Sequence, residues 1–276
     1  MSEREGSVAV AAQPNGTTDA TLCNARVVAI ANQKGGVGKT TTAINLSAEL
    51  ARRGKRVLLV DIDPQGNATT GLGLEKSDIS ACMYDVIIKS SPLDNIVCRT
   101  QVDGLWIAPS TLNLAGAEIE LVSAISRELR LRNALRPCLS AYDYVFIDCP
   151  PSLGLLTLNA MSAADALIVP IQAEYFALEG LGQLTHVIEL VRSHLNAHVR
   201  ILGVLITMFD SRTNLGAQVV DEVEKYFPGL VFGSRIPRSI RLSEAPSHGA
   251  PIAVFDPKGK GAAAYAALAS EVLARE

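Results

Sequence analysis

The chain has 276 residues, of which 48% are hydrophobic and 19% are charged, and its formal net charge is −3. This composition is typical of a folded domain with a large core, and it excludes disorder over most of the length. The five cysteines (Cys23, Cys82, Cys98, Cys138 and Cys149) include no CxxC pair, which favours unpaired thiols in a reducing cytosol over a disulfide-linked secreted protein.

The first 25 residues differ from the rest of the chain. They mix Ser, Gly, Thr, Asn, Gln and Ala without sustained periodicity, so we expect residues 1–25 to form a flexible tail. The segment lacks the basic start and apolar centre of a signal peptide. Farther along, the longest apolar run, residues 201–209, is about half of the ~18 residues that a membrane-spanning helix needs. The sequence therefore predicts a tail followed by one domain, residues 26–276, with no membrane span.

From residue 26 onward, apolar runs alternate with helical patterns. Strands are predicted at residues 27–31, 57–62, 104–108, 144–147, 166–171, 201–209 and 231–232. Helices are predicted at residues 39–53, 113–135, 155–163, 178–195, 215–227 and 259–275. This alternation favours an α/β fold with a mostly parallel twisted sheet and helices on both faces. Ligands of such sheets bind at the carboxyl ends of the strands.

The segment 32–41 joins the first predicted strand to the first predicted helix and has the pattern of a phosphate-binding loop. Such a loop turns backbone N–H groups toward one centre at a helix N-terminus, where a polyphosphate can bind. Lys39 adds a charge for the β- and γ-phosphates, and the Thr40 hydroxyl can ligate Mg²⁺. The ordinary pattern has glycine six residues before that lysine, but this chain has Gln33 there, followed by a second lysine, Lys34. We therefore expect a fold of the P-loop NTPase type with a variant loop.

Two other predicted strands end in aspartates at the same edge of the sheet. Residues 56–67 finish a strand with Asp61 and Asp63, which share one face because they lie two residues apart. Residues 143–151 form an apolar strand that ends in Asp148, the Walker B form. A carboxylate buried at a strand end costs several kcal/mol unless a cation or donors satisfy it, so a metal and its waters best explain the set. Capping of loops or helices stays open as the alternative, most of all for Asp61.

The run Lys34-Gly-Gly-Val-Gly-Lys-Thr40 resembles the deviant Walker A motif of the ParA/MinD superfamily of dimeric ATPases. Residues 61–67 are similar to the switch I of that family, and residues 148–151 to its switch II. The resemblance implies that residues 26–276 are a single deviant-Walker ATPase domain that takes ATP and Mg²⁺ and forms an ATP-dependent homodimer. The nucleotide-binding residues implied in this way are Lys34, Gly35, Gly36, Val37, Gly38, Lys39, Thr40, Thr41, Asp148, Met208, Pro237 and Ser239.

The resemblance also implies a role for each charged residue. Lys39 would bind phosphate within its own subunit, and Lys34 would reach the nucleotide of the partner subunit. Asp63 would position or activate the attacking water, Asp148 would hold Mg²⁺ through water, and Thr40 would ligate the ion directly. The catalytic set is then Lys34, Lys39 and Asp63, and the metal set is Thr40, Asp63 and Asp148. The reaction would be in-line phosphoryl transfer to water.

The contacts to the base are implied by shorter matches. Pro237 and Ser239 match a proline and the residue two positions after it that contact the base in ParA-like proteins. That family often has Asn where this chain has Ser239, a departure that bears on hydrogen bonding to the base. Met208, near the end of a predicted strand, is another candidate contact, with ordinary core packing as the alternative.

Four further segments resemble the chromosomal ParA (Soj) branch: residues 112–118, 174–181, 207–215 and 235–249. In that branch the ATP-bound dimer binds double-stranded DNA without sequence preference, and Arg212 and Arg241 match its DNA-binding arginines. Arg238 is a third candidate, and a salt-bridge role stays open for all three. The resemblance implies a cytoplasmic, nucleoid-associated partition switch whose hydrolysis is stimulated by a DNA-bound, ParB-like protein, and it favours a chromosomal over a plasmid role.

Three other functions stay open on the same fold. A membrane-recruited, MinD-like ATPase would need a cationic amphipathic C-terminal helix, whereas residues 262–276 are mostly small and apolar, typical of a helix that packs on the core. An iron–sulfur reductase component would need cysteines at the site, for which Cys138 and Cys149 are the candidates. A small-molecule kinase or ligase would need a substrate pocket and no dependence on DNA.

Overall fold

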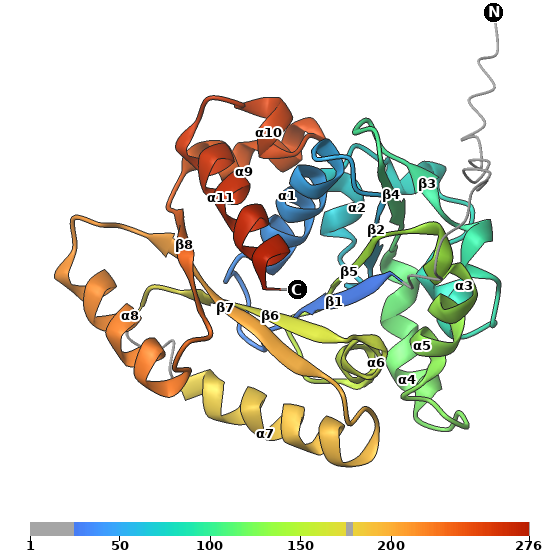
Figure 1. Ribbon diagram of the computed structural model, residues 1–276. Coiled ribbons are helices and arrows are strands. Elements are labelled where there is room, and N and C mark those ends of the chain that lie inside the picture. The colour runs from blue at the N-terminus through green and yellow to red at the C-terminus, as the bar shows by residue number, and fades with distance from the viewer. Residues whose placement is uncertain (1–24, 175–178, 276) are drawn as a thin grey trace, which may run out of the picture.

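A computed structural model of the chain describes residues 25–174 and 179–275 (Figure 1). Of the predicted tail, only Ala25 lies within these residues, and residues 175–178 of the Soj-like segment 174–181 also lie outside them. The described strands form one eight-stranded sheet in the order β3-β4-β2-β5-β1-β6-β7-β8. Every neighbouring pair is parallel except β3 and β4. The predicted mostly parallel α/β fold is confirmed.

The strands are β1 (Arg26–Ile30), β2 (Val57–Asp61), β3 (Cys98–Arg99), β4 (Leu105–Ala108), β5 (Tyr144–Asp148), β6 (Ala166–Gln172), β7 (Arg200–Phe209) and β8 (Val231–Pro237). The α-helices are α1 (Lys39–Arg52), α2 (Asn67–Gly71), α3 (Met83–Ile87), α4 (Ala117–Leu121), α5 (Arg130–Leu135), α6 (Leu155–Ala163), α7 (Glu179–His194), α8 (Asn214–Tyr226), α9 (Ile240–Glu244), α10 (Ile252–Phe255) and α11 (Lys260–Ala274). Most predicted elements are found within a residue or two of the expected ends.

The helices lie in two layers, one on each face of the sheet (Figure 1). One apolar core joins the sheet to α1, α2 and α9 to α11, and a second core joins its other face to α3 to α8. Both cores form because the central strands β1, β2 and β5 are apolar on both sides, as buried parallel strands are. Helix α11 buries Tyr265, Leu268 and Val272 in the first core, so the expectation that the C-terminal helix packs on the core is confirmed.

The prediction of one helix over residues 113–135 is wrong. The structure has a 3-10 turn (Leu112–Gly116), then α4, then turns, and then α5. Ser126, in the interruption, has a φ of 51°, which no α-helical residue adopts. Buried Asn159 on α6 holds the break, because its amide nitrogen donates to the Arg127 carbonyl (2.7 Å) and its oxygen accepts from the Leu131 N–H (3.1 Å). A hydrogen bond from a distant helix thus overrides the local pattern.

The predicted strand at residues 231–232 is the start of a longer strand, β8. Its side chains alternate, with Phe232, Ser234 and Ile236 buried and Gly233 and Arg235 exposed. A strand at the end of a sheet carries fewer apolar residues than a central one, which is why the apolar pattern alone indicated only two residues.

The sheet brings the predicted motifs together at the carboxyl ends of its central strands. Asp148, the last residue of β5, is paired in register with Ile30 of β1 on one side and with Asp61 of β2 on the other. The loop that follows β1 and the aspartates that follow β2 and β5 therefore meet at the carboxyl ends of the three central strands, where ligands of parallel sheets bind.

Candidate functional site

The loop between β1 and α1 has the backbone of a phosphate-binding loop. Gly36 and Gly38 have φ angles of 73° and 86°, which glycine adopts without strain. Gly38 precedes α1, and this helix end has no side-chain cap and no acidic residue in its first turn. The first N–H groups of α1 are therefore left for another acceptor, and the positive end of the helix favours an anion there.

Hydrogen bonds to the neighbouring strands β6 and β7 hold the loop in place. Asn32 donates to the Pro170 carbonyl of β6 (2.8 Å) and accepts from the Lys34 N–H (3.0 Å). The Thr207 hydroxyl of β7 donates to the Val37 carbonyl (2.8 Å). Sequence reasoning did not single out Asn32 or Thr207, since neither contact can be derived without knowing that β6 and β7 lie beside the loop.

The two lysines of the loop have different environments. Lys39 is buried, and its Nζ donates to the Lys34 carbonyl (3.0 Å). Burial lowers the pKa of Lys39, while Asp148 and Asp63 act in the opposite direction. The Lys34 side chain is 38% exposed and points to Glu174, with 3.7 Å between Nζ and Oε2. Lys39 therefore faces the loop, whereas Lys34 is available at its surface.

Asp148 is the carboxylate of the site that most needs a ligand. It is fully buried, and neither of its oxygens has a hydrogen-bond partner within ordinary distance limits among the described residues. Burial and then the Asp61 charge raise the pKa of Asp148 well above its ordinary value, and the nearby Thr40 hydroxyl and Lys39 counteract them. A buried carboxylate without donors, next to a threonine hydroxyl, fits a divalent cation and its waters.

Asp61 has a different role from Asp148. One of its oxygens accepts from the Asp63 N–H (3.1 Å), and the other accepts from the Thr69 N–H (2.9 Å) and hydroxyl (2.7 Å). Burial raises the pKa of Asp61 to about 6 although these bonds lower it. Of the two alternatives that the sequence left open, the structure supports capping for Asp61. Asp63 is also buried and accepts from the Gln65 N–H (2.9 Å) through one oxygen.

The described residues contain no cluster of three or more His, Cys, Asp or Glu side chains able to hold a metal ion unaided. Magnesium sites in nucleotide-binding proteins often use only one or two protein ligands, with phosphates and water as the remainder. Thr40 and Asp148 fit that pattern, and Asp63 lies beside them.

The predicted base contacts line one cavity of about 370 Å³ together with Gly38 and Thr41 of the loop. Met208, Pro237 and Ser239 all border it. Met208 has a φ of 50°, which is uncommon outside glycine and marks a backbone held by its surroundings. The structure thus brings the three candidates together beside the phosphate-binding loop, as expected.

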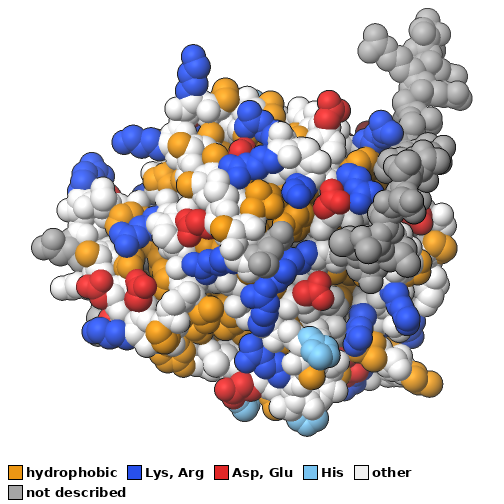
Figure 2. Space-filling model, in the orientation of Figure 1, with side chains coloured by type: hydrophobic (Ala, Val, Ile, Leu, Met, Phe, Trp, Pro, Cys, Tyr) orange, Lys and Arg blue, Asp and Glu red, His pale blue; other side chains and the backbone are white. Residues whose placement is uncertain are grey.

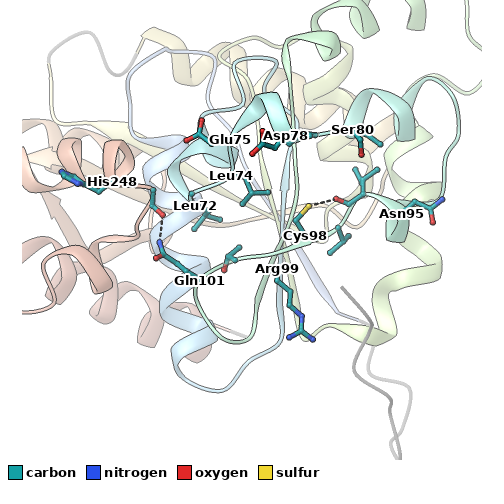
Figure 3. Close-up of a pocket in the computed structure, with 17 residues that line it drawn as sticks. Leu72, Leu74, Glu75, Asp78, Ser80, Asn95, Cys98, Arg99, Gln101 and His248 are labelled. Atoms are coloured by element: carbon teal, nitrogen blue, oxygen red, sulfur yellow. Dashed lines mark hydrogen bonds between the residues drawn. The ribbon is translucent and has the colours of Figure 1, made fainter. Parts of the chain in front are cut away.

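A second cavity, of about 520 Å³, lies at the β3 edge of the sheet (Figure 3). Leu72, Cys98 and His248 border it, and none of the predicted site residues does. Its position beyond α2 separates it from the phosphate-binding loop, so it is not part of the candidate nucleotide site.

The three predicted DNA-binding arginines are exposed, and each forms an ion pair, the alternative that the sequence left open without naming the acidic partner. Arg212 makes a two-pronged contact with Asp210 (2.9 and 2.7 Å). Arg241 contacts Glu244 (3.1 Å), and Arg238 contacts Glu174 (3.6 Å). Figure 2 shows Lys and Arg side chains scattered over the visible face among apolar and uncharged atoms. Exposed ion pairs contribute at most about 1 kcal/mol, so a phosphate can replace each acid.

The cysteines do not form a cluster at the site. Cys149 directly follows Asp148 and is buried, but Cys138 lies before the amino end of β5, where its thiol donates to Asp94 (3.1 Å). Burial raises the pKa of Cys138 to about 12. The expectation that Cys138 lies near the site is wrong, because β5 separates the two cysteines.

No helix of the described residues is long and apolar enough to cross a membrane.

A glycine-rich loop before a helix, with an aspartate at the end of a neighbouring parallel strand, defines the class of P-loop nucleoside triphosphatases. The comparisons agree, since the family model described as an AAA domain matches residues 25–201. Sporulation initiation inhibitor protein Soj of Bacillus subtilis is 58% identical over 90% of this chain and 98% of its own length. Chromosome-partitioning ATPase Soj of Treponema pallidum is 47% identical over 91% of this chain and 98% of its own length.

The chain therefore belongs to the Soj/ParA family of chromosome-partitioning ATPases. Among solved structures, cobyrinic acid a,c-diamide synthase of Mycobacterium smegmatis with bound ADP and magnesium is similar, with a TM-score of 0.80 and 38% identity over 90% of this chain and 94% of that one.

Proposed function

We propose that the protein is an ATP-dependent DNA-partitioning switch. In this proposal two subunits dimerise around two ATP molecules, the dimer binds double-stranded DNA without sequence preference, and hydrolysis releases it. A DNA-bound, ParB-like partner stimulates the hydrolysis and so drives segregation of a chromosome or plasmid. The main support is the second lysine of the loop, because the Lys34 side chain is 38% exposed and its Nζ lies 3.7 Å from Glu174 Oε2, whereas Lys39 is buried.

Each charged residue then has a distinct task in hydrolysis. Lys39 binds the β- and γ-phosphates in its own subunit, and Asp63 orients the attacking water. Lys34 from the other subunit neutralises charge on the transferring phosphoryl group. Thr40 and Asp148 would hold Mg²⁺, which supplies charge neutralisation on the phosphates when bound. Hydrolysis loosens the dimer because the γ-phosphate joins the two subunits.

Binding to DNA depends on dimerisation in this proposal. A monomer with a net charge of −3 has a few exposed arginines, and a two-fold dimer doubles them. Arg212, Arg238 and Arg241 would then leave Asp210, Glu174 and Glu244 for DNA phosphates. Because each phosphate contact releases counterions, affinity falls steeply with salt.

The test is binding to unrelated duplex DNA with ATP, ADP or no nucleotide, over a salt series, for the wild type, Lys34→Ala and Arg241→Ala. We expect salt-sensitive binding with ATP only, lost in both variants, with dimerisation lost only in Lys34→Ala. Arg99→Ala is a suitable control, since this exposed arginine lies at the far edge of the sheet. A wild type that dimerises and hydrolyses ATP but has no affinity for DNA would refute the partition proposal.

One observation favours a second candidate, a ligase acting on a small molecule. The similar structure from Mycobacterium smegmatis carries the name of a synthase for a cobyrinic acid diamide. In that case the phosphoryl group of ATP would be transferred to a small-molecule acceptor, and ATP turnover would depend on that acceptor and be indifferent to DNA. Measuring ATP turnover with and without duplex DNA and a ParB-like protein separates the two candidates, because only the partition switch is stimulated.

A further inference from the structure

A third cavity lies at the amino ends of the parallel strands, whereas the phosphate-binding loop lies at their carboxyl ends. It has a volume of about 940 Å³ and is bordered by the amino ends of β1 and β7, by α5 and by the 3-10 turn Arg136–Ala141. Four arginines from these segments line it: Arg26, Arg132, Arg136 and Arg200. Neither the proposed function nor the family resemblance assigns a role to this cavity.

Within the described part of the chain, the side chains of these four arginines have no interaction partners. Among the described residues, five arginines lack a side-chain hydrogen bond, ion pair or ring contact: Arg26, Arg99, Arg132, Arg136 and Arg200. The other described arginines all have at least one. Four of the five unpartnered arginines therefore line one cavity, and the Nε of Arg26 is both buried and without a hydrogen bond.

The remaining polar lining does not compensate these charges. Among the described residues that border the cavity, Asp165 is the one carboxylate, and it accepts from the Val27 N–H (2.8 Å) without an ion pair to any of the four arginines. His198 also borders it and adds positive charge when protonated. Guanidinium groups gathered around one cavity repel one another, and an anion bound among them removes that repulsion.

We propose that this cavity is a binding site for a small, multiply charged phosphate compound, of the size of an inorganic or nucleoside polyphosphate. Guanidinium groups pair with phosphate oxygens through two parallel hydrogen bonds, and four of them match an anion with several charges. The cavity volume lies in the range of small-molecule sites. The arginines come from separate segments and converge on one hollow, which suits a compact ligand.

The cavity is also distinct from the DNA-binding arginines of the proposed function. Strand β7 runs from Arg200 at the cavity to Phe209 beside the nucleotide site, so about 30 Å separate Arg200 from Phe209, which lies three residues before Arg212. A second possible occupant is the N-terminal segment, which joins the domain at Ala25 on the cavity wall and carries the acids Glu3, Glu5 and Asp19.

The test is calorimetric titration of inorganic tripolyphosphate into the full-length protein, with the phosphate-binding loop saturated by Mg²⁺-ADP. The double variant Arg132→Ala/Arg136→Ala is compared with Arg99→Ala, which removes the unpartnered arginine outside the cavity. We expect the double variant to bind at least tenfold more weakly and Arg99→Ala to bind like the wild type. Arg132→Lys/Arg136→Lys, which keeps the charges but loses the forked geometry, should be intermediate. Both sites changed are exposed, and equal urea midpoints would show that the variants fold.

Four outcomes would overturn the proposal. The first is equal tripolyphosphate affinity in the wild type and the double variant. The second is binding that Lys39→Ala abolishes, since the ligand would then occupy the phosphate-binding loop. The third is a protein that binds duplex DNA through Arg132 and Arg136 but does not bind tripolyphosphate. The fourth is binding seen only after deletion of residues 1–24, which would make that segment the natural occupant. The proposal does not rest on dimerisation or DNA partition.

Discussion

The carboxyl edge of this sheet, where the carboxyl ends of its parallel strands lie, and the amino edge, where their amino ends lie, carry charge in different ways. At the carboxyl edge the charges are buried and close to charges of the other sign, as Lys39 is to Asp148 and Asp63. At the amino edge, the cavity lined by Arg132, Arg136 and Arg200 holds exposed charges that are mostly of one sign, with Asp165 as the one carboxylate among its described lining residues. A buried charge without donors requires a ligand because desolvation is costly, whereas an exposed cluster is screened by salt. Changes at the carboxyl edge should therefore have the larger effects.

The largest effect is expected for Asp63→Ala, which tests whether the carboxyl edge is the catalytic one. Loss of the group that orients water should reduce ATP turnover by about 10²- to 10⁴-fold. ATP binding should persist, because Lys39 and the loop are unchanged. Steady-state turnover and equilibrium ATP binding measure the two separately. Asp78→Ala, which changes an exposed aspartate outside the site, is the control, and undiminished turnover in Asp63→Ala would contradict the assignment.

A smaller effect is expected for Thr69→Val, which tests whether Asp61 is structural. The Thr69 hydroxyl donates to Asp61 (2.7 Å) and accepts from the Ser110 N–H (2.9 Å), and both partners are buried. Removing it should lower the free energy of unfolding by about 2 kcal/mol, because a buried carboxylate and a buried N–H lose a partner.

Urea denaturation measures that change, and Thr70→Val is its matched control. The Thr70 hydroxyl makes only long, local contacts with the carbonyls of Gly66 (3.3 Å) and Asn67 (3.4 Å), so its loss should change stability by less than about 0.5 kcal/mol. Equal losses in the two variants would show that Asp61 does not depend on Thr69.

The smallest effect is expected at the amino edge, for the paired carboxylate Asp143. Its oxygens accept from the Arg56 guanidinium (2.8 Å) and from the Arg56 N–H (2.7 Å). Burial raises the pKa of Asp143, but the hydrogen bonds from Arg56 outweigh it and leave the pKa below its ordinary value. The unfolded chain then binds a proton more readily than the folded chain, so the pair stabilises the fold at neutral pH and loses this effect as the pH falls through the lowered pKa.

Asp143→Asn should therefore cost up to about 1 kcal/mol at pH 7, the upper range for a partly exposed pair. The difference from the wild type should begin to shrink when the pH falls below about 4, where the carboxylate of the unfolded chain takes up a proton. It should shrink further as the pH falls through the lowered pKa of the folded chain. Urea midpoints of both proteins from pH 7 to pH 3 measure this. A difference that stays constant over that range would show that the charge of Asp143 is unimportant.

The fold was predictable where a local pattern and the tertiary environment agree. Apart from their charged terminal residues, strands β1, β2 and β5 are apolar because both of their faces are covered, and that pattern is visible in the sequence. The error at residues 113–135 arose where they disagree. Asn159 supplies hydrogen bonds to Arg127 and Leu131, and nothing near residue 113 in the sequence indicates that α6 lies alongside.

The candidate site was predictable for a related reason. The phosphate-binding loop is contiguous, so its glycines and lysines are read together, and the sheet then brings Asp148 to it. The difference between Asp61 and Asp148 was not predictable, because it depends on Thr69 donating to one carboxylate and on nothing donating to the other among the described residues. A salt-bridge role was left open for the exposed arginines, but the identities of their acidic partners were not predictable for the same reason.

The sequence by itself determined the class of this protein, since spacing within one loop and the residues at two strand ends are local properties of the chain. The tertiary structure alone decided which charges are satisfied. Arg26, Arg132 and Arg200 are far apart in the sequence, and only the parallel order of β1, β6 and β7, with α5 beside them, brings them to one cavity. Electrostatic energy depends on distance and burial, and neither quantity is a local property of the sequence.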